Sequence, residues 1–548
     1  MDAKSTVFLL LALLGLSGCV VKPDPISEEE HWRRAQADRA DTAREQPPPT
    51  RPLTVEEAVA RAVKYNLDHR LALMEKAFQA RQIDIANLQM LPNLALGAGY
   101  TIRDNELASE SISYKTRKVT LEPSVSSERN SLYADLAFSW SALDFGLSYF
   151  QAKQQADQFL ILHERRRRLL NNLVKDVVST YWRVATAERI EPQVAAALAE
   201  AERALHVYRQ IEANKKAPLA QTLEQQRALI GIAGQLRRVS MDIASTKARL
   251  AALLNLPLSA NIEIAAYDEA DLPIPTLSAS LADMENLGLY LRPDLREEAY
   301  RERIDRAEIR REALRMIPGI ELLGGGYYDA NKYLVHKFWA NAGAKVTTDL
   351  LAIAGRARQY KAAKFQALVT RERRLAGTVA ALVQIQMSYL QYHQAMQLYR
   401  DAEEVAAIEQ KLLNLADSST QVKAIGDLDR IRQSALAVTS RLERDRYLIE
   451  VFMAFGNLYF SVGGDLMNGA EGGEDLETLT GIAREGLAHW TAGRFPALPA
   501  DARREEGPSL ADGILPGASA VPDLGGAPAA SEMPESVPVS VPSGQEAN

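Results

Sequence analysis

The chain has 548 residues, of which 47% are hydrophobic and 25% are charged, and 64 basic residues stand against 71 acidic ones for a net charge of −7. This balance gives no reason to expect a nucleic acid as partner, because nucleic-acid-binding domains carry a basic excess. After the N-terminal segment no stretch reaches 18 uninterrupted apolar residues, so we expect no membrane-spanning helix. If the mature chain crosses a membrane, it has to do so with β-strands in a closed barrel.

Residues 1–18 are typical of a secretory signal peptide. Lys4 precedes an apolar run over residues 7–16, which is too short to span a bilayer, and small residues follow it. The motif Leu16-Ser17-Gly18-Cys19 resembles the bacterial lipobox, after which the cysteine is acylated, for example with palmitate, and becomes the mature N-terminus. Cys19 is the only cysteine of the chain. The alternative is an ordinary cleaved signal with an incidental cysteine. Because one acyl chain binds a membrane only marginally, firm attachment needs several chains or a second insertion device.

The two ends of the mature chain have the composition of unfolded segments. Residues 19–52 are charged and contain Pro47-Pro48-Pro49, and we interpret them as a lipidated N-terminal tether. Residues 496–548 are rich in Pro, Ala, Gly and Ser with few large apolar side chains, which predicts a disordered tail. A segment at 466–495 connects this tail to the body of the protein.

The body contains an internal repeat. Met90-Leu91-Pro92-Asn93-Leu94 is echoed by Met316-Ile317-Pro318-Gly319-Ile320 at an offset of 226 residues. A repeat of this length is too long for a solenoid unit and indicates a duplicated half-protein. We therefore predict two repeats, 53–265 and 279–465, each with the order helix, strand hairpin, helix, helix.

Each repeat contains segments with the period-two alternation of β-strands. In the first, a helix predicted over 70–91 ends at Pro92, and strands follow at 94–101 and 132–140 on either side of a polar loop, 103–130. In the second, residues 338–347 alternate in the same way. Strands of about ten residues have the length that a tilted transmembrane strand needs. One face is apolar, and the other includes four polar residues predicted to face a lumen: Asp135, Ser139, Asn341 and Lys345. A soluble sheet with one buried face is the alternative.

Long helices are predicted between and after the strands. They cover residues 146–214, 219–255, 354–416 and 427–460, with turns at 214–218 and 417–420. The first would extend about 100 Å at 1.5 Å per residue. Apolar residues recur at steps of three and four, as in coiled-coil packing. The charge run Arg165-Arg166-Arg167-Arg168 is expected to be a solvated helix face.

Four strands per chain are too few to close a barrel, whereas three chains would supply twelve, enough for a pore. Local sequences agree with such an arrangement: Leu143-Asp144-Phe145-Gly146, Leu250-Ala251-Ala252-Leu253-Leu254-Asn255-Leu256-Pro257 and Arg292-Pro293-Asp294-Leu295. Together with the duplicated order, these segments resemble the TolC outer-membrane efflux family over roughly residues 53–465. The resemblance implies a mainly α fold with membrane β: long antiparallel coiled-coil helices form a periplasmic α-barrel, and a trimer shares a 12-stranded outer-membrane β-barrel with four strands per chain. It also places the segment 466–495 at the equator of the helices.

The function implied by the resemblance is an export channel for efflux or type I secretion, lipid-anchored in the outer membrane with a large periplasmic part. Its partners would be two further copies of the chain, a periplasmic adaptor and an inner-membrane pump. No cofactor other than the lipid on Cys19 and no metal is expected. An enzyme is not expected either, since the sequence holds no HExxH, Walker or GxSxG motif, and Gly324-Gly325-Gly326 does not precede a helix. The alternative function is a periplasmic coiled-coil lipoprotein that acts as a structural spacer or adaptor.

A channel is controlled by its gate rather than by catalytic residues. Asp427 and Asp429 follow the second helical turn, and the resemblance suggests that threefold symmetry turns one of them into a ring of carboxylates that selects cations. Alternatively, both are acids at a helix N-terminus, favoured by the helix dipole. Lys215, Lys216 and Lys423 are candidate contacts at the periplasmic tip, or else ordinary solvated lysines.

Overall fold

The computed structural model describes residues 24–44, 46, 49–119, 122–215, 218–257, 262–267, 274–277, 279–421, 427–470 and 472–496. All of them lie in one compact unit, Met1–Pro496. Three of the predicted site residues, Cys19, Lys216 and Lys423, lie outside the described residues, as does the predicted tail beyond Pro496.

The two halves of the unit contain the same elements in the same order. The first half consists of α3 (Val55–Tyr65), α4 (Leu67–Leu88), β1 (Asn93–Ile102), β4 (Asn130–Ser141), α5 (Ala142–Ala213) and α6 (Leu219–Leu253). The second consists of α7 (Leu281–Leu291), α8 (Pro293–Leu314), β5 (Gly319–Asp329), β6 (Phe338–Thr347), α9 (Ala352–Gln421) and α10 (Asp427–Ser461), and α11 (Leu476–Thr491) follows it. The predicted strands and long helices are thereby confirmed, with ends shifted by a few residues. The polar loop between β1 and β4 carries a small hairpin, β2 (Ala108–Ser109) and β3 (Ser124–Val125).

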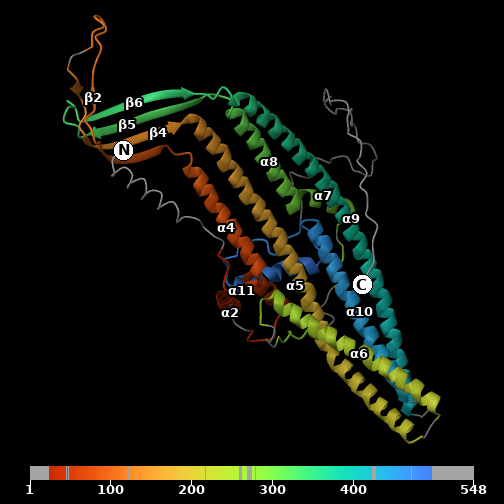
Figure 1. The fold of residues 1–548 in the computed structure, drawn as a ribbon. Coiled ribbons are helices and arrows are strands. Elements are labelled where there is room, and N and C mark those ends of the chain that lie inside the picture. Colours follow the sequence, from red (N-terminus) through yellow and green to blue (C-terminus); the bar gives the residue numbers. More distant parts are fainter. Residues whose placement is uncertain are drawn as a thin grey trace, which may run out of the picture. The chain divides into compact units, whose positions relative to one another are not determined.

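The four long strands form one antiparallel sheet in the order β1-β4-β5-β6, and it lies at one end of the long helices (Figure 1). Each strand is joined to a helix by at most a few residues, so the helices continue the order of the strands. Accordingly α4 packs against α5, α5 against α8, and α8 against α9. The sheet and the helices next to it are therefore a single layer of four elements, with β1 and α4 at one lateral edge and β6 and α9 at the other.

Farther from the sheet, α6 replaces α4 and α10 replaces α8 in the layer. α5 and α9 run through both levels with 72 and 70 residues, whereas α6 and α10 have 35 each. α5 stays helical through Pro192. The part of α5 farther from the sheet packs against α6 and α10. The buried apolar residues at this contact are Ile190, Val194, Ala197, Leu236, Ala435 and Val438. Within the described residues, no helix combines the length and the apolar character needed to cross a membrane.

The short helices α3, α7 and α11 cover one face of this layer at the level where α8 gives way to α10. α3 packs against α5 and α11, and α7 packs against α9. The approach of α7 to α9 requires a glycine, because a Cβ atom on Gly288 would lie 2.3 Å from the Ile385 side chain. The rings of Phe455 and Trp490, tilted by 59° with centroids 5.7 Å apart, join α10 to α11. The opposite face of the layer is not covered by these three helices.

Three sequence expectations require correction. The tether contains a helix, α2 (Glu28–Arg44), whose acidic first turn and exposed Glu30–Arg34 ion pair favour helical structure. The turn expected at 417–420 lies within α9, where the Ser418 hydroxyl donates to the Asn414 carbonyl of the preceding turn. The arginine run is a solvated face only in part, because Arg165 and Arg168 are exposed, whereas Arg166 is 4% exposed and Arg167 is bound on several sides.

Arg166 reaches from α5 to a fully buried histidine at the start of α4. The Arg166 guanidinium donates to His69 Nε2 at 3.2 Å and also to the Ala470 carbonyl, while His69 Nδ1 lies 2.7 Å from the Val63 carbonyl. Nδ1 therefore carries the proton, and the ring is neutral. Burial lowers the pKa of His69, and the positive charge of Arg166 acts in the same direction.

We expect this histidine to make stability depend on pH. Because its pKa is lower in the folded chain than the ordinary value of 6.5, the unfolded chain binds more protons, and stability is lost as the pH falls below that value. Each pKa unit by which folding lowers the pKa of His69 corresponds to about 1.4 kcal/mol of folding free energy lost at low pH. His69→Gln should reduce the fall in thermal midpoint between pH 7.5 and 5.5, measured on the detergent-purified protein. The control is His336→Gln at an exposed position, and an unchanged fall in the His69 variant would contradict the assignment.

Candidate functional site

The four predicted lumen residues share one face of the sheet. Ala137 on β4 pairs with Gly325 on β5, and Gly325 pairs with Asn341 on β6. Paired residues, and residues two apart on a strand, point to the same side. Asp135 and Ser139 are each two residues from Ala137 and therefore share its face. Lys345 is four residues from Asn341 on β6, so it also lies on this face. Sequence alternation thus identified a polar face that the register confirms as continuous across strands.

Glycines on the polar face make room for its larger side chains. Gly97 pairs with Asp135, and a Cβ atom at Gly97 would lie 2.6 Å from the Asp135 carboxylate. A side chain at position 97 would therefore displace Asp135. On this face, a glycine on one strand leaves space for the larger side chain that pairs with it on the next strand.

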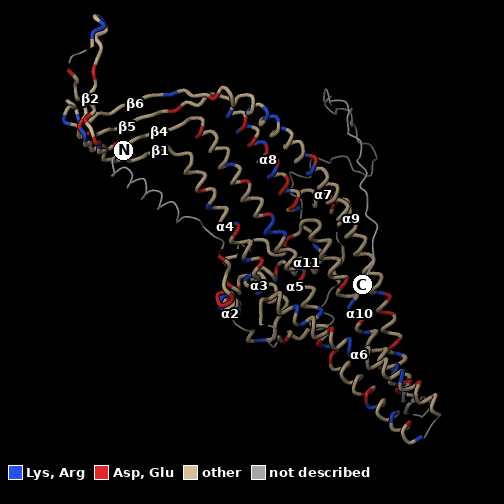
Figure 2. Tube along the Cα trace, in the orientation of Figure 1, with Lys and Arg blue, Asp and Glu red and all other residues tan. Residues whose placement is uncertain are grey.

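The other face of the sheet is apolar and exposed. Leu96 is 81% exposed, Phe338 68% and Val346 67%. The same face carries further exposed apolar side chains on all four strands: Leu94, Tyr100, Ile102, Leu132, Leu136, Phe138, Ile320, Leu322 and Tyr328. Figure 2 shows charged residues concentrated in the loops at the far end of the sheet and along the helices, with few on the strands. An apolar patch of this extent marks an interaction surface.

Both lateral edges of the layer are also incomplete. β1 and β6 are the outer strands of the described sheet, so each has one row of backbone groups that no described strand pairs with. The helices that continue them carry exposed apolar residues at steps of three, four or seven. On α4 these are Leu67, Leu71, Met74, Phe78, Ile85 and Leu88, and on α9 they are Phe365, Leu368, Leu375, Val379, Val383, Met387 and Leu390. Such spacing produces a stripe suited to packing against another helix.

At the end of the helices away from the sheet lie the described candidate gate and tip residues, Asp427, Asp429 and Lys215. Asp427 is the first residue of α10, and Asp429 is exposed in its first turn. Lys215 follows α5 with a φ of 52°, in the left-handed region that favours glycine. The described residues also include an ionic contact that sequence reasoning missed: Arg430 on α10 pairs with Glu200 on α5 and, at 3.6 Å, with Asp417 on α9. Arg430 thereby joins three helices near the proposed gate.

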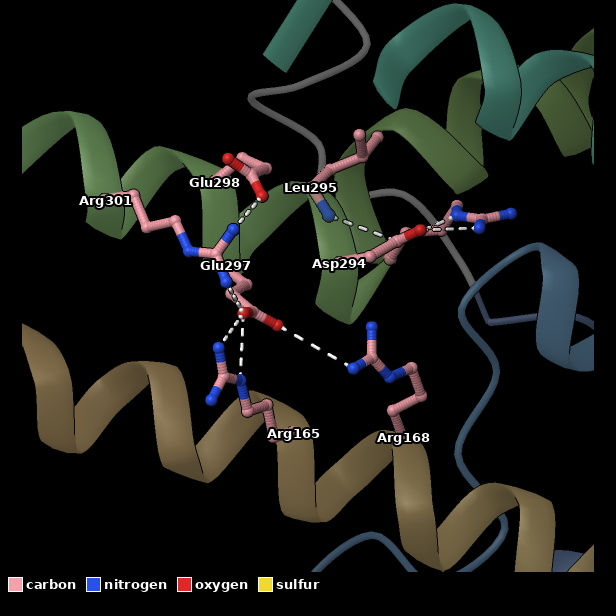
Figure 3. A network of polar contacts seen from close by, with 8 residues as sticks. Arg165, Arg168, Asp294, Leu295, Glu297, Glu298 and Arg301 are labelled. Atoms are coloured by element: carbon pink, nitrogen blue, oxygen red, sulfur yellow. Dashed lines mark hydrogen bonds and ion pairs between the residues drawn. The ribbon is translucent and has the colours of Figure 1, made fainter. Parts of the chain in front are cut away.

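The most extensive charged contact lies between α5 and α8 and is centred on Glu297 (Figure 3). Oε1 of Glu297 accepts from Arg165 at 2.7 and 2.9 Å and from Arg301 at 2.5 Å, and Oε2 lies 3.9 Å from Arg168. The Glu297 side chain is 6% exposed, whereas Arg165 and Arg168 are about half exposed. A buried carboxylate requires such partners to offset its desolvation.

Asp294, one helical turn before Glu297, is held by a second arginine. Arg292 forms two hydrogen bonds with the Asp294 carboxylate, at 2.9 and 2.7 Å. Burial acts to raise the pKa of Asp294, but the hydrogen bonds and charge of Arg292 outweigh it, and the net pKa is lowered. Asp294 is therefore ionised at neutral pH. The arginine run was visible in the sequence, but its partners Glu297 and Asp465 lie more than a hundred residues away.

Removal of the Glu297 charge should leave clustered cations without a partner. We expect Glu297→Gln to destabilise the protein by about 2–3 kcal/mol, less than a fully buried pair because the arginines are partly hydrated. The matched control is Glu298→Gln, which has one ion-pair partner, Arg301, among the described residues and should cost less than about 1 kcal/mol. The measurement is the denaturation midpoint in detergent; equal losses in both variants would contradict the central role of Glu297.

Comparison with known proteins identifies the fold. No protein-family model matches the chain, and no curated protein sequence matches it. Among solved structures, the CmeC outer membrane channel of Campylobacter jejuni matches with a TM-score of 0.60 and 14% identity, covering 80% of this chain and 89% of that one. The MtrE outer membrane channel of Neisseria gonorrhoeae in its open state matches with a TM-score of 0.58 and 16% identity, over 75% and 89% of the two chains.

The outer membrane protein VceC of Vibrio cholerae also matches, with a TM-score of 0.58 and 14% identity over 75% of this chain and 96% of that one. These matches cover 89–96% of the solved chains. None of these three proteins is described as an enzyme. The chain therefore has the fold of TolC-type outer-membrane channels, as the resemblance of its sequence predicts.

Proposed function

We propose that the chain is one protomer of a trimeric outer-membrane export channel, an efflux or type I secretion duct that connects a periplasmic adaptor and an inner-membrane pump to the exterior. The observation that carries the proposal is the two-sided sheet, apolar and exposed on one face and polar on the other. In water the apolar face would cost about 25 cal/mol for each Å² left exposed. In a bilayer the same face is favourable, and the polar face lines an aqueous passage.

The open edges support three copies. Strand edges inside a bilayer must be paired, because lipid offers no hydrogen bonds. Pairing β6 of one copy with β1 of the next would close a ring, and three copies supply twelve strands, enough for a pore. The apolar stripes of α9 and α4 lie at these same two edges, so ring closure would bury both. Acylation of Cys19 would add a lipid anchor, in line with the two attachments that stable binding needs.

At the tip, we propose Asp427 or Asp429 as the constriction and Lys215, Lys216 and Lys423 as contacts for the adaptor. A ring of three carboxylates would favour cations. Arg430, which pairs with Glu200 and Asp417, supports a gate at this level because it restrains α10 against α5 and α9.

The experiment that tests the function is single-channel conductance of the detergent-purified full chain in planar bilayers, together with its oligomeric mass. A trimer with stable conductance is expected. A Cys19→Ala variant should still insert, since the barrel would hold it. A protein that is monomeric and water-soluble without its lipid would overturn the channel and favour a periplasmic spacer.

The gate proposal has its own test in the same bilayers. Asp427→Ala/Asp429→Ala should reduce the preference for cations, read as a shift of the reversal potential in a KCl gradient, because the carboxylate ring is lost. Glu477→Ala, an acid in the first turn of α11 and far along the chain from the tip, is the control. An unchanged reversal potential in the double variant would place the constriction elsewhere.

Two adjacent residues of β6 test which face meets lipid. Ala342 belongs to the apolar face and Asn341 to the polar face, and both are exposed in the single chain. Ala342→Arg should block membrane insertion, because an arginine on the lipid face costs about 2–4 kcal/mol near the bilayer midplane. Asn341→Arg should insert normally. The readout is the amount of heat-stable trimer in outer-membrane fractions; equal yields would contradict the assignment of the faces.

A further inference from the structure

A polar groove runs along the face of the layer opposite α7, where α8 gives way to α10. Two hollows of about 570 and 580 Å³ share Arg168 and Asp294 in their walls. We call them together the cationic groove, after the basic side chains that line it: Arg165, Arg168, Lys175, Arg292, Arg301 and Arg373. Only three acidic residues, Asp294, Glu297 and Glu298, line the described walls.

The acids of the groove are already neutralised. Arg292 binds Asp294, Arg165 and Arg301 bind Glu297, and Arg301 also binds Glu298. This pairing leaves three cations in excess. Arg168 lies 3.9 Å from Glu297, Lys175 donates to the Asn457 side chain, and no described acid pairs with Arg373. Each copy of the chain therefore presents a net positive surface here, although the whole chain carries −7.

The helix positions place the groove on the uncovered face. Arg165, Arg168, Asn172 and Lys175 follow one another on α5 at steps of three and four, whereas Arg166 points to the other side, toward His69 under α3 and α11. On α9, Gln384 and Gln391 line the groove, while Ile385 lies under α7. A duct must keep its lumen clear, so the face covered by α3, α7 and α11 would be the outer one. The cationic groove then faces the lumen.

We propose that the cationic groove is a binding station for multivalent anions, solutes with two or more carboxylate or phosphate groups, inside the duct. The inference rests on the proposed channel function. Arg168 and Lys175 are seven residues apart, about 10 Å along α5, so they can hold two separate anionic groups of one solute. Guanidinium and ammonium groups bind carboxylate and phosphate oxygens, and the amides of Asn172 and Gln391 supply further donors. Threefold symmetry would place three such grooves around one lumen, which raises the local concentration of anions.

The test uses the full-length protein and citrate as the probe. Citrate should block single-channel currents in 0.1 M KCl, and Arg168→Gln/Lys175→Gln should weaken the block at least about tenfold, because hydrogen bonds to charged groups are lost. Raising KCl to 1 M should weaken it as well, since the Debye length falls from about 10 to 3 Å. The variant should fold, because Glu297 keeps Arg165 and Arg301 as partners.

Controls separate this inference from the channel itself. Arg484→Gln/Arg494→Gln removes two positive charges at and just after α11 on the covered side and should leave the citrate block unchanged. Calorimetric binding of citrate to the purified protein in detergent gives a readout independent of conductance. Conductance with a citrate block that the Arg168/Lys175 variant does not weaken would overturn the anion station and leave the channel intact. Citrate binding lost in that variant, without any conductance, would support the site and contradict the channel.

Discussion

An antiparallel sheet with two open edges and one exposed apolar face cannot satisfy its own backbone or its own side chains. Four strands of about ten residues are too few to curl into a closed ring. The remaining elements of the fold follow from this constraint. Each strand is joined directly to a helix, so the helices have the same order as the strands. The lateral edges of the helix layer carry the apolar stripes of α4 and α9, where the sheet leaves β1 and β6 open. The sheet and the helix layer are incomplete at the same two lateral edges, so in the proposed trimer one neighbouring copy would complete both.

The interior of the layer is held differently at its two levels. Near α6 and α10 the contacts are apolar, with Ile190, Leu236 and Val438 in the core. Between α5 and α8 they are ionic, centred on Glu297. α8 has a strongly polar sequence, with arginine, glutamate and aspartate making up more than half of its 22 residues, and it cannot pack through an apolar stripe. The charged surface left by this packing faces the uncovered side, so in the proposed channel the positive charge of the lumen at this level would be a by-product of how α8 is attached.

Much of the architecture was readable in the sequence because it depends on local periodicity. The alternation at 94–101 and 338–347 gave β1 and β6, and the offset between Pro92 and Pro318 gave the duplicated order. Short helices such as α3, α7 and α11 were not anticipated, since helices of 11 to 16 residues give a weak periodic signal and their stability comes from packing. The arginine run was seen, but its burial was not, because the partners Glu297, Asp465 and His69 come from distant segments. That Asp135 and Lys345 share one face of the sheet was predictable from the alternation, whereas the contact of Arg430 with two other helices was not.

The shared carboxylate of Glu297 has a consequence for how the sequence can change over time. Any one of Arg165, Arg168 and Arg301 can be replaced while the others still neutralise the acid, whereas replacement of Glu297 removes the shared carboxylate from all three at once and leaves Arg301 with Glu298. The arginines are therefore individually expendable, and the glutamate is not. Related chains should drift freely at the basic positions, one at a time, and lose the acid only after the basic residues around it have already gone.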